Sequence, residues 1–483
     1  MVWPSTGRHA LDLRVDVDSI DINSPVMDRL SGDFYQIYRF WGFTWRVYRE
    51  SWIVDAPTVK RSTWETEITG RVRFWQGTHP ETNVRVRIPR SWFGRGGPAE
   101  VAFLDAGGRP TSTYSCPRVA TSLRELALEV DVCASVNAAP ILPEYSTHAH
   151  PTRPNIPRRT LTIESAYQEE GARVAIRPDH TVIDDSAAQF STWSIAELHD
   201  AMETHFSQYA GRWPAWQMWG LLAGTFDRSS VAGVMFDYAG AGEPPERQGF
   251  AVFRNHTWFA NLPGPGGPTN DAEAQAMRDY LYTWIHEAGH AFNFMHSWDK
   301  GRPDALSWMN YPSRYDNRNG ANSFWSDFEF RFDDEELIHL RHGDRASVIM
   351  GGDPWGSGGH LEGPPGASSQ LEGQVPIEFL LRSKENFEFM EPVELELRIR
   401  NLLEDSSLEL DTRLRPEFGG VSVFIQRPDG RTVQYAPVTS MLATPRLRTL
   451  EPFEKEKKGE DRYSEDVFLS YGKYGFYFRE PGE

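Results

Sequence analysis

Three histidines in the stretch from residue 286 to residue 296 have a spacing that suits a metal site. His286 and His290 are four residues apart, so on a helix both imidazoles project from the same face toward one point. His296 follows six residues later, beyond the expected end of that helix. Three neutral imidazoles with an open fourth position are typical of a catalytic zinc site rather than a closed structural one. The stretch therefore predicts a zinc centre.

Two further residues of this stretch are Glu287, a candidate general base, and Asn293, a candidate for the turn that follows the helix. Glu287 follows the first histidine, where its carboxylate can reach a water held by the metal. Zinc lowers the pKa of such a water to about 7, and Glu287 would act as general base and later return the proton to the leaving amine. Asn is one of the few non-glycine residues that tolerate the left-handed conformation, so Asn293 can turn the chain and bring His296 back to the metal. The alternative is a helix with unrelated surface histidines.

Capping signals predict the helices that would position these residues. Ser194 followed by Glu197, and Asp333 followed by Glu336, are capping boxes, and each predicts the start of a helix. A third helix is expected to begin near Asn270 and to carry the first two histidines. Short strands are expected between the first of these helices and the metal helix, so this part of the chain has α+β character.

Polar and apolar residues alternate on both sides of these helices, which is the pattern of half-buried strands. Two stretches rich in proline or glycine predict linkers. We therefore expect a multi-domain protein in which β-sandwich domains flank a central α+β catalytic domain. The predicted parts are an N-terminal β-sandwich (1–137), a Pro-rich linker (138–158), the catalytic domain (159–352), a Gly/Pro-rich linker (353–374) and a C-terminal Ig-like β-sandwich without an obvious closing strand (375–483).

The histidine stretch resembles the metzincin metallopeptidase signature, HExxHxxGxxH, with Asn293 where the family usually has glycine. The stretch from Ser307 to Pro312 is similar to the Met-turn of that family, with Met309 as the methionine beneath the metal. Ser297, after the third histidine, is similar to the matrixin branch. Tyr311 instead resembles the tyrosine of the astacin and serralysin branches, which ligates zinc or binds the transition-state oxyanion. The resemblance implies a metzincin-like central domain and leaves the branch open.

Metzincin sheets also have an edge strand along the substrate cleft, and the resemblance suggests a candidate for it upstream of the metal helix. An extended peptide adds to such an edge by main-chain hydrogen bonds. The resemblance therefore implies a zinc endopeptidase that acts on a protein or peptide substrate. The candidate strand is Gly249, Phe250, Ala251, Val252 and Phe253.

Two other functions stay open. The flanking β domains favour an adhesin or carbohydrate-binding protein, in which these domains bind polysaccharide or protein and the central domain is catalytically idle. The intact Glu287 argues against this function, because an idle zinc site need not keep a general base beside its first ligand. The other alternative keeps zinc hydrolysis but acts on a non-peptide amide.

The charge of the chain excludes some classes of partner. The 483 residues contain 50 Lys and Arg and 68 Asp and Glu, and the net charge of −18 argues against nucleic acid. No uninterrupted apolar stretch has the length of a membrane span. The acidic excess is concentrated in residues 161–360, which carry −14, against +3 for residues 1–160 and −7 for residues 361–483. This distribution predicts a negative cleft that prefers neutral or basic peptides.

Weaker signals concern the cysteines, a second metal and the location of the protein. Cys116 and Cys133 form one disulfide or remain two thiols. Calcium is a further candidate cofactor at Asp237, Asp327 and Asp333, although no EF-hand-like spacing supports it. The N-terminus lacks a basic segment followed by an apolar one. This absence favours a protein that stays inside the cell. Multi-domain metzincins with β modules are usually extracellular, so the resemblance instead implies a secreted or extracellular protein, and both locations stay open.

Overall fold

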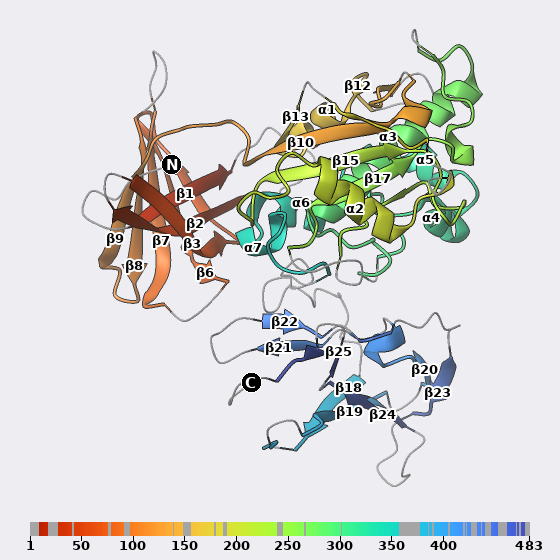
Figure 1. Cartoon of the computed structure of the whole chain (residues 1–483). Coiled ribbons are helices and arrows are strands. Elements are labelled where there is room, and N and C mark those ends of the chain that lie inside the picture. Colours follow the sequence, from red (N-terminus) through yellow and green to blue (C-terminus); the bar gives the residue numbers. More distant parts are fainter. Residues whose placement is uncertain are drawn as a thin grey trace. The chain divides into compact units, whose positions relative to one another are not determined.

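A computed structural model describes most of the chain, which divides into two compact units, Met1–Leu361 and Glu362–Glu483 (Figure 1). Of the described residues, 38% lie in strands and 20% in helices. The described residues are 9–17, 28–40, 43–75, 79–90, 97–138, 140–147, 156–177, 180–186, 191–238, 245–264, 267–300, 302–356, 377–384, 386–388, 391–403, 406–418, 421, 423–426, 432–435, 437–439, 446–452, 461–469, 471–472 and 475–478.

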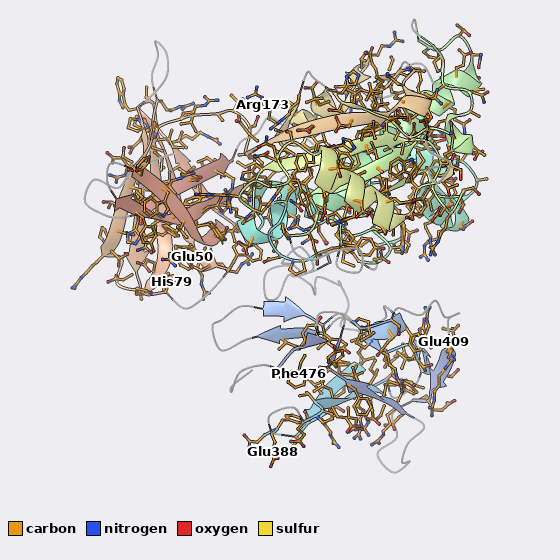
Figure 2. All side chains as sticks on the ribbon, viewed as in Figure 1. Glu50, His79, Arg173, Glu388, Glu409 and Phe476 are labelled. Atoms are coloured by element: carbon orange, nitrogen blue, oxygen red, sulfur yellow. The ribbon has the colours of Figure 1, made fainter. Side chains whose placement is uncertain are left out.

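The first unit begins with two antiparallel sheets around one apolar core, with strand orders β1-β2-β3-β6 and β4-β5-β7-β8-β9. Leu11 of the first sheet and Phe103 of the second are both fully buried in this core, which makes the two sheets a β-sandwich. Figure 2 shows Glu50 of the first sheet beside His79, whose Nε2 lies 2.7 Å from the Glu50 carboxylate. The strands are β1 (His9–Asp16), β2 (Arg29–Phe40), β3 (Phe43–Val54), β4 (Thr58–Arg61), β5 (Glu65–Arg71), β6 (Arg73–Phe74), β7 (Glu81–Pro89), β8 (Ala99–Asp105) and β9 (Pro110–Cys116).

A mixed six-stranded sheet follows in the same unit, with the order β13-β10-β15-β17-β16 and with β14 paired to β10. The pairs that involve β10, and the pair of β15 with β17, are parallel, whereas β16 is antiparallel to β17. Strands β15 and β17 are nearly continuous runs of buried residues, as expected of strands covered on both faces. The strands are β10 (Arg124–Cys133), β13 (Ala172–Ile176), β14 (Val182–Ile183), β15 (Gln217–Ala223), β16 (Gly233–Val234) and β17 (Gly249–Phe253), and β11 (Tyr145–Ser146) and β12 (Thr160–Leu161) form a separate pair.

Helices α2 and α3 cover opposite faces of this sheet. A Cβ atom at Gly249 would lie 2.5 Å from the Met202 Sδ of α2, whereas the next residue, Phe250, packs edge-on against Trp284 of α3. Successive residues of a strand point to opposite faces, so the two contacts lie on opposite faces of the sheet. The helices are α1 (Ile163–Glu169), α2 (Ile195–His205), α3 (Asp271–Ala291), α4 (Pro312–Asn319), α5 (Ser323–Asp327), α6 (Asp334–His342) and α7 (Arg345–Val348).

The helix starts follow the capping signals. Ser194 and Asp333 each accept a hydrogen bond from the backbone N–H three residues on, and Glu197 and Glu336 complete the two capping boxes. Asn270 caps α3 by accepting from the Glu273 N–H. These expectations are confirmed, because capping depends only on residues within the first turn.

The expected fold class is wrong. We expected a separate metzincin-like α+β domain between two β-sandwiches, but the structure is mostly β, with many small sheets and seven helices in its described part. Strand β10 explains part of the difference, because its alternation suggested the N-terminal sandwich although it pairs with β13 and β15 in the mixed sheet. Sandwich and mixed sheet belong to one compact unit.

The second unit contains four small sheets in its described residues, and not the expected Ig-like sandwich. The orders are β18-β19-β24, β20-β23, β21-β22 and β25-β26. Most of the Gly/Pro-rich linker (353–374) and residues 148–155 of the Pro-rich linker (138–158) lie outside the described residues. The strands are β18 (Ile377–Ser383), β19 (Glu394–Asn401), β20 (Leu408–Asp411), β21 (Phe424–Gln426), β22 (Thr432–Gln434), β23 (Leu447–Leu450), β24 (Arg462–Phe468), β25 (Tyr471–Gly472) and β26 (Gly475–Phe476).

The structure bears on the two cysteines and on membrane-spanning helices. Cys116 and Cys133 are both buried free thiols, so the alternative of a disulfide is excluded. Throughout the part of the chain that the structure describes, every helix is too short or too polar to cross a membrane.

Candidate metal centre

Helix α3 brings the first two histidines together. It has 21 residues and is buried along most of its length, with His286 and His290 in its last two turns. Their Nε2 atoms are 3.2 Å apart. The helical period therefore places both imidazoles at one point, as their spacing predicts.

Asn293 turns the chain after α3. Its φ is 69°, the left-handed conformation that the sequence analysis expected of it. Its side-chain nitrogen donates to the Ser347 carbonyl at 3.1 Å, and its side-chain oxygen accepts from the Gly356 N–H at 2.9 Å. These bonds hold the turn against α7 and the segment that follows it.

The turn returns His296 to the other two histidines. The His296 ring centroid lies 5.2 Å from that of His286 and 4.6 Å from that of His290. One ligand atom from each of the three residues lies within 4.8 Å of the others, and in the described residues no other cluster of His, Cys, Asp or Glu meets this criterion. The three histidines could therefore hold a metal ion.

The second nitrogen of each imidazole is hydrogen-bonded outside the cluster. His286 Nδ1 lies 2.7 Å from the Trp308 carbonyl, and His290 Nδ1 lies 2.6 Å from the Phe294 carbonyl. A carbonyl only accepts, so both Nδ1 atoms carry the hydrogen and both Nε2 atoms present a lone pair. His296 Nδ1 lies 3.0 Å from the Asp299 carboxylate. This is the arrangement that orients imidazoles toward a metal.

The two imidazoles are not protonated near neutral pH, so no proton bridges the two lone pairs. Burial lowers the pKa of His286 to about 4 and also holds the pKa values of His290 and His296 well below 6.5. Near neutral pH all three imidazoles are therefore uncharged. Two Nε2 lone pairs 3.2 Å apart repel each other unless a cation lies between them.

Glu287 lies on the same helix and faces the edge of the mixed sheet. It is buried, and burial raises its pKa to about 8, although a hydrogen bond from the Met235 N–H opposes this shift. A Cβ atom at Gly233 of β16 would lie 2.6 Å from the Glu287 Cγ, so only glycine leaves room for the glutamate. The carboxyl group is therefore held between α3 and β16.

Met309 lies directly beneath the metal helix. It is fully buried, and a Cβ atom at Gly289 would lie 2.6 Å from the Met309 Sδ. The Ser307 hydroxyl accepts from the Met309 N–H at 3.0 Å and donates to the Glu336 carboxylate of α6. Gly289 thus allows the methionine loop, residues 307–312, to approach the helical turn of α3 between His286 and His290.

Tyr311 and Trp298 border the cluster on the side of His296. Trp298 stacks on the His296 ring at a centroid distance of 4.0 Å and an angle of 12°, and the Tyr311 ring lies 4.2 Å from that of Trp298. Tyr311 is 40% exposed, and its ring lies 5.5 Å from that of His286. Burial of its hydroxyl raises the pKa of Tyr311, so the phenol stays protonated at neutral pH.

Several residues around the cluster were not found from the sequence. They are Asp299, Trp298, Trp355 and Glu336. Asp299 and Trp298 are within three residues of His296, so their proximity was a usable signal. Trp355, whose ring lies 5.0 Å from that of His290, is distant in sequence, and nothing local marks it.

The candidate edge strand is wrong. Gly249, Phe250, Ala251, Val252 and Phe253 form β17, whose residues are all buried and which pairs on both sides, with β15 and β16. The strand at this edge in the described part of the sheet is β16, which has two residues and neighbours Glu287. The buried apolar run of β17 fits an inner strand.

The aspartates considered for calcium have other partners. Asp237 accepts from the Gln248 N–H at 2.6 Å, and Asp327 accepts from the Tyr315 hydroxyl at 3.0 Å. Asp333 caps α6. None of the three belongs to the cluster that could hold a metal ion.

Comparisons with known proteins give no family for this chain. A scan against protein-family models found no match, and a search of curated proteins found none either.

Proposed function

We propose that the protein is a zinc-dependent endopeptidase. The observation that carries the proposal is the pair of Nε2 atoms of His286 and His290, which lie 3.2 Å apart while the Nδ1 of each residue is within hydrogen-bond distance of a backbone carbonyl. Glu287, a buried carboxyl group, follows the first of these residues. A metal site accompanied by a base is the combination that hydrolysis requires.

The ion is proposed to be zinc because three neutral imidazoles without carboxylate or thiolate ligands suit it. His286, His290 and His296 would hold it through Nε2, and the bonds from their Nδ1 atoms would fix the ring orientations. Copper and nickel also accept imidazole ligands, so the metal must be identified by measurement. When bound, zinc supplies a Lewis acid and lowers the pKa of a water ligand.

Glu287 is proposed to move the proton. A carboxyl group with a pKa of about 8 accepts a proton readily at neutral pH, and a nearby cation would lower this value toward the working pH. The Met235 N–H and Gly233 hold the side chain in place. Glu287 would take the proton from the attacking water and deliver it to the leaving amine.

Tyr311 is proposed to stabilise the oxyanion. Its phenol is protonated at neutral pH, and its ring lies beside His286 and His296. A phenol O–H is a hydrogen-bond donor that can stabilise negative charge developing on a carbonyl oxygen. Trp298, which packs against the rings of His296 and Tyr311, would hold the tyrosine in place.

A peptide substrate is favoured because a sheet edge lies beside the base. Ala232 and Val234 face β17 with their main-chain groups, since the Ala232 carbonyl accepts from Phe253 and Val234 is paired with Ala251. The N–H and C=O of Gly233 therefore point away from β17, on the same side as the Met235 N–H that reaches Glu287. An extended peptide can pair with such groups.

The proposal is tested by Glu287→Gln, with Glu335→Gln as the matched control. Glu335 is on α6 and its side chain is 62% exposed. Metal content is measured by elemental analysis, and cleavage of a proteome-derived peptide library is measured by mass spectrometry with and without chelator. We expect one zinc per chain in the wild-type protein and in both variants. Cleavage should be sensitive to chelator, and Glu287→Gln should lower it at least 100-fold.

Four results would contradict the proposal. Absence of stoichiometric metal would exclude the metal centre, and another metal in the purified protein would exclude zinc. Cleavage that persists undiminished in Glu287→Gln would exclude Glu287 as the base. Absence of cleavage across the library by the zinc-loaded protein would exclude the endopeptidase.

A further inference from the structure

A cavity of about 340 Å³ opens beside β16, on the side of the sheet opposite the metal centre. Its apolar lining comes from Ile195 at the start of α2, Phe226, Val231, Val234 of β16 and Tyr238. This volume is at the lower end of the range for ligand sites and suits a single large side chain. The lining residues have no part in the proposed chemistry.

The two faces of β16 are assigned by its neighbours. A Cβ atom at Gly233 would point toward Thr283 and Glu287 of α3, the helix that also carries His286 and His290. Val234 is the next residue, so its side chain points to the α2 face and into the cavity. Phe253 points to the same face of β17 as Gly249, which faces α2, because the two residues are four positions apart on the strand. Phe226 lies on that face too, because its ring centroid is 4.9 Å from that of Phe253.

The mouth of the cavity is polar. Asp227 and Arg228 line it and are both exposed. Asp227 already accepts a hydrogen bond from the Thr192 hydroxyl at 2.6 Å, and the Arg228 carbonyl accepts from the Val231 N–H at 2.9 Å. These bonds involve the Asp227 carboxylate and the Arg228 main chain, and the other five lining residues are apolar or aromatic.

We propose that this cavity is a specificity pocket that binds one large apolar side chain of the peptide substrate. The inference rests on the proposed peptidase function. A peptide paired with β16 would direct alternate side chains to the two faces of the sheet. One set faces α3 and Glu287, and a residue of the other set lies beside Val234, where the cavity receives its side chain.

The occupant follows from the lining. Aliphatic and aromatic walls favour a Phe, Tyr, Leu or Met side chain, whose transfer from water is favourable, and they give no partner to a charged group. The alternation also predicts a pattern. The preference for large apolar residues falls at one position of the substrate, and the two adjacent positions, which face the metal side, do not share it.

The test compares Val231→Phe, which fills the cavity, with Val119→Phe as the matched control. Val119 is 73% exposed and lies outside the cavity. For the zinc-loaded protein, Val231→Phe is expected to lower kcat/KM at least tenfold for peptides with a large apolar residue at the preferred position. Peptides with alanine at that position should be cleaved equally by all three proteins. If Val231→Phe does not fold, Val231→Ala enlarges the cavity and should broaden the preference.

A second measurement separates this proposal from the proposed function. Zinc-loaded Glu287→Ala, with and without Val231→Phe, is used to capture peptides from the library by affinity. Enrichment of a large apolar residue at one position, lost in the Val231→Phe background, supports the pocket even if the wild-type protein cleaves nothing. Cleavage or capture without such a preference, or with one that Val231→Phe leaves unchanged, overturns the pocket alone. Absence of both cleavage and capture overturns both proposals.

Discussion

At the scale of single residues, the cluster depends on what holds the imidazoles in place. Two of the three Nδ1 acceptors are backbone carbonyls, and the third is the Asp299 side chain, which a substitution can remove. Loss of such an outer partner usually weakens metal binding 10- to 100-fold. We expect Asp299→Ala to lower zinc affinity by about this factor, measured by competition with a chelator of known affinity.

The control for Asp299 is Asp304→Ala in the same loop. The Asp304 side chain is 50% exposed and contacts Arg318 and Asn319 at the surface. Its removal should leave zinc affinity unchanged. Equal affinity in the two variants would show that Asp299 does not orient His296.

A second prediction concerns the contact between Gly289 and Met309. A Cβ atom at Gly289 would lie 2.6 Å from the Met309 Sδ, and both residues are buried beside the histidines. Such overpacking usually costs about 1–3 kcal/mol, so Gly289→Ala should lower the free energy of unfolding by this amount in urea titrations. Gly264→Ala, where nothing lies within 4 Å of the new methyl group, should change it little.

The double variant tests the physical reason. Gly289→Ala together with Met309→Ala removes the atoms that collide, so the two effects should be less than additive. Strict additivity would mean that the methionine is not the neighbour that excludes a side chain at Gly289.

Much of the local geometry could be predicted, because it depends on local rules. The helical period brings His286 and His290 together, and the tolerance of Asn for positive φ places the turn at Asn293. Trp355 could not be found in this way, because its contact with His290 depends on how two distant segments pack. The acceptors of the Nδ1 bonds were also hidden, since backbone carbonyls leave no trace in the sequence.

At the scale of elements, α6 links the methionine loop to the rest of the unit. Glu336 is almost fully buried and accepts from Lys300 at 2.6 Å and from the Ser307 hydroxyl. The Lys300 side chain is only 4% exposed, so Glu336→Gln would remove the carboxylate that contacts a buried ammonium and leave it the more distant charge of Asp333. We expect a loss of about 3–5 kcal/mol in the free energy of unfolding, measured by urea titration.

The matched control is again Glu335→Gln, one position away on the same helix. Its carboxylate is 62% exposed and pairs with Arg302, so the expected change is within about 0.5 kcal/mol. Similar losses in both variants would mean that burial of the ion pair does not matter to α6.

The elements themselves were only partly predictable. Capping boxes set the starts of α2 and α6, but the pattern of β10 does not say which sheet it joins, because alternation reports exposure and not partners. The sheet that β10 joins is decided by pairing between distant segments, and β10 pairs with β13 and β15 in the mixed sheet, not with the strands of the sandwich. The edge strand was missed for a similar reason: two residues of β16 cover β17, and so short a strand has no readable pattern.

At the scale of the whole first unit, buried charges join the N-terminal sandwich to the mixed sheet and to α6. Arg14 and Arg124 both contact the Asp33 carboxylate, at 2.6 and 3.3 Å. Asp16 of β1 lies 3.1 Å from His342 at the end of α6. Each group is almost fully buried, so each depends on its partner across the contact.

His342 predicts how the stability of this unit depends on pH. Burial lowers its pKa to about 4, although the hydrogen bond to Asp16 opposes the shift, whereas the pKa in the unfolded chain is about 6.5. Below pH 6.5 the unfolded chain therefore binds a proton that the folded chain does not. The contribution of the neutral His342 to the free energy of unfolding is therefore complete above pH 6.5 and decreases as the pH falls toward 4.

The loss at pH 5 should reach about 2 kcal/mol relative to pH 7.5, measured as free energy of unfolding in urea. His342→Gln, which cannot titrate, should reduce this difference, and His9→Gln, in which an exposed histidine is replaced, should not. An unchanged pH dependence in His342→Gln would exclude the histidine as its source.

The same contacts predict that the unit that contains the three histidines needs the sandwich and that the sandwich is not a removable module. Deletion of residues 1–118 would leave Arg124 and His342 without Asp33 and Asp16, and α6, which holds the methionine loop, would lose its buried contacts. We expect this variant to bind no zinc and to lack a cooperative thermal transition. Deletion of residues 362–483, which form a unit of their own, should leave zinc stoichiometry and the transition of the first unit intact. A folded, zinc-binding protein made of residues 119–361 alone would show that the mixed sheet does not need the sandwich.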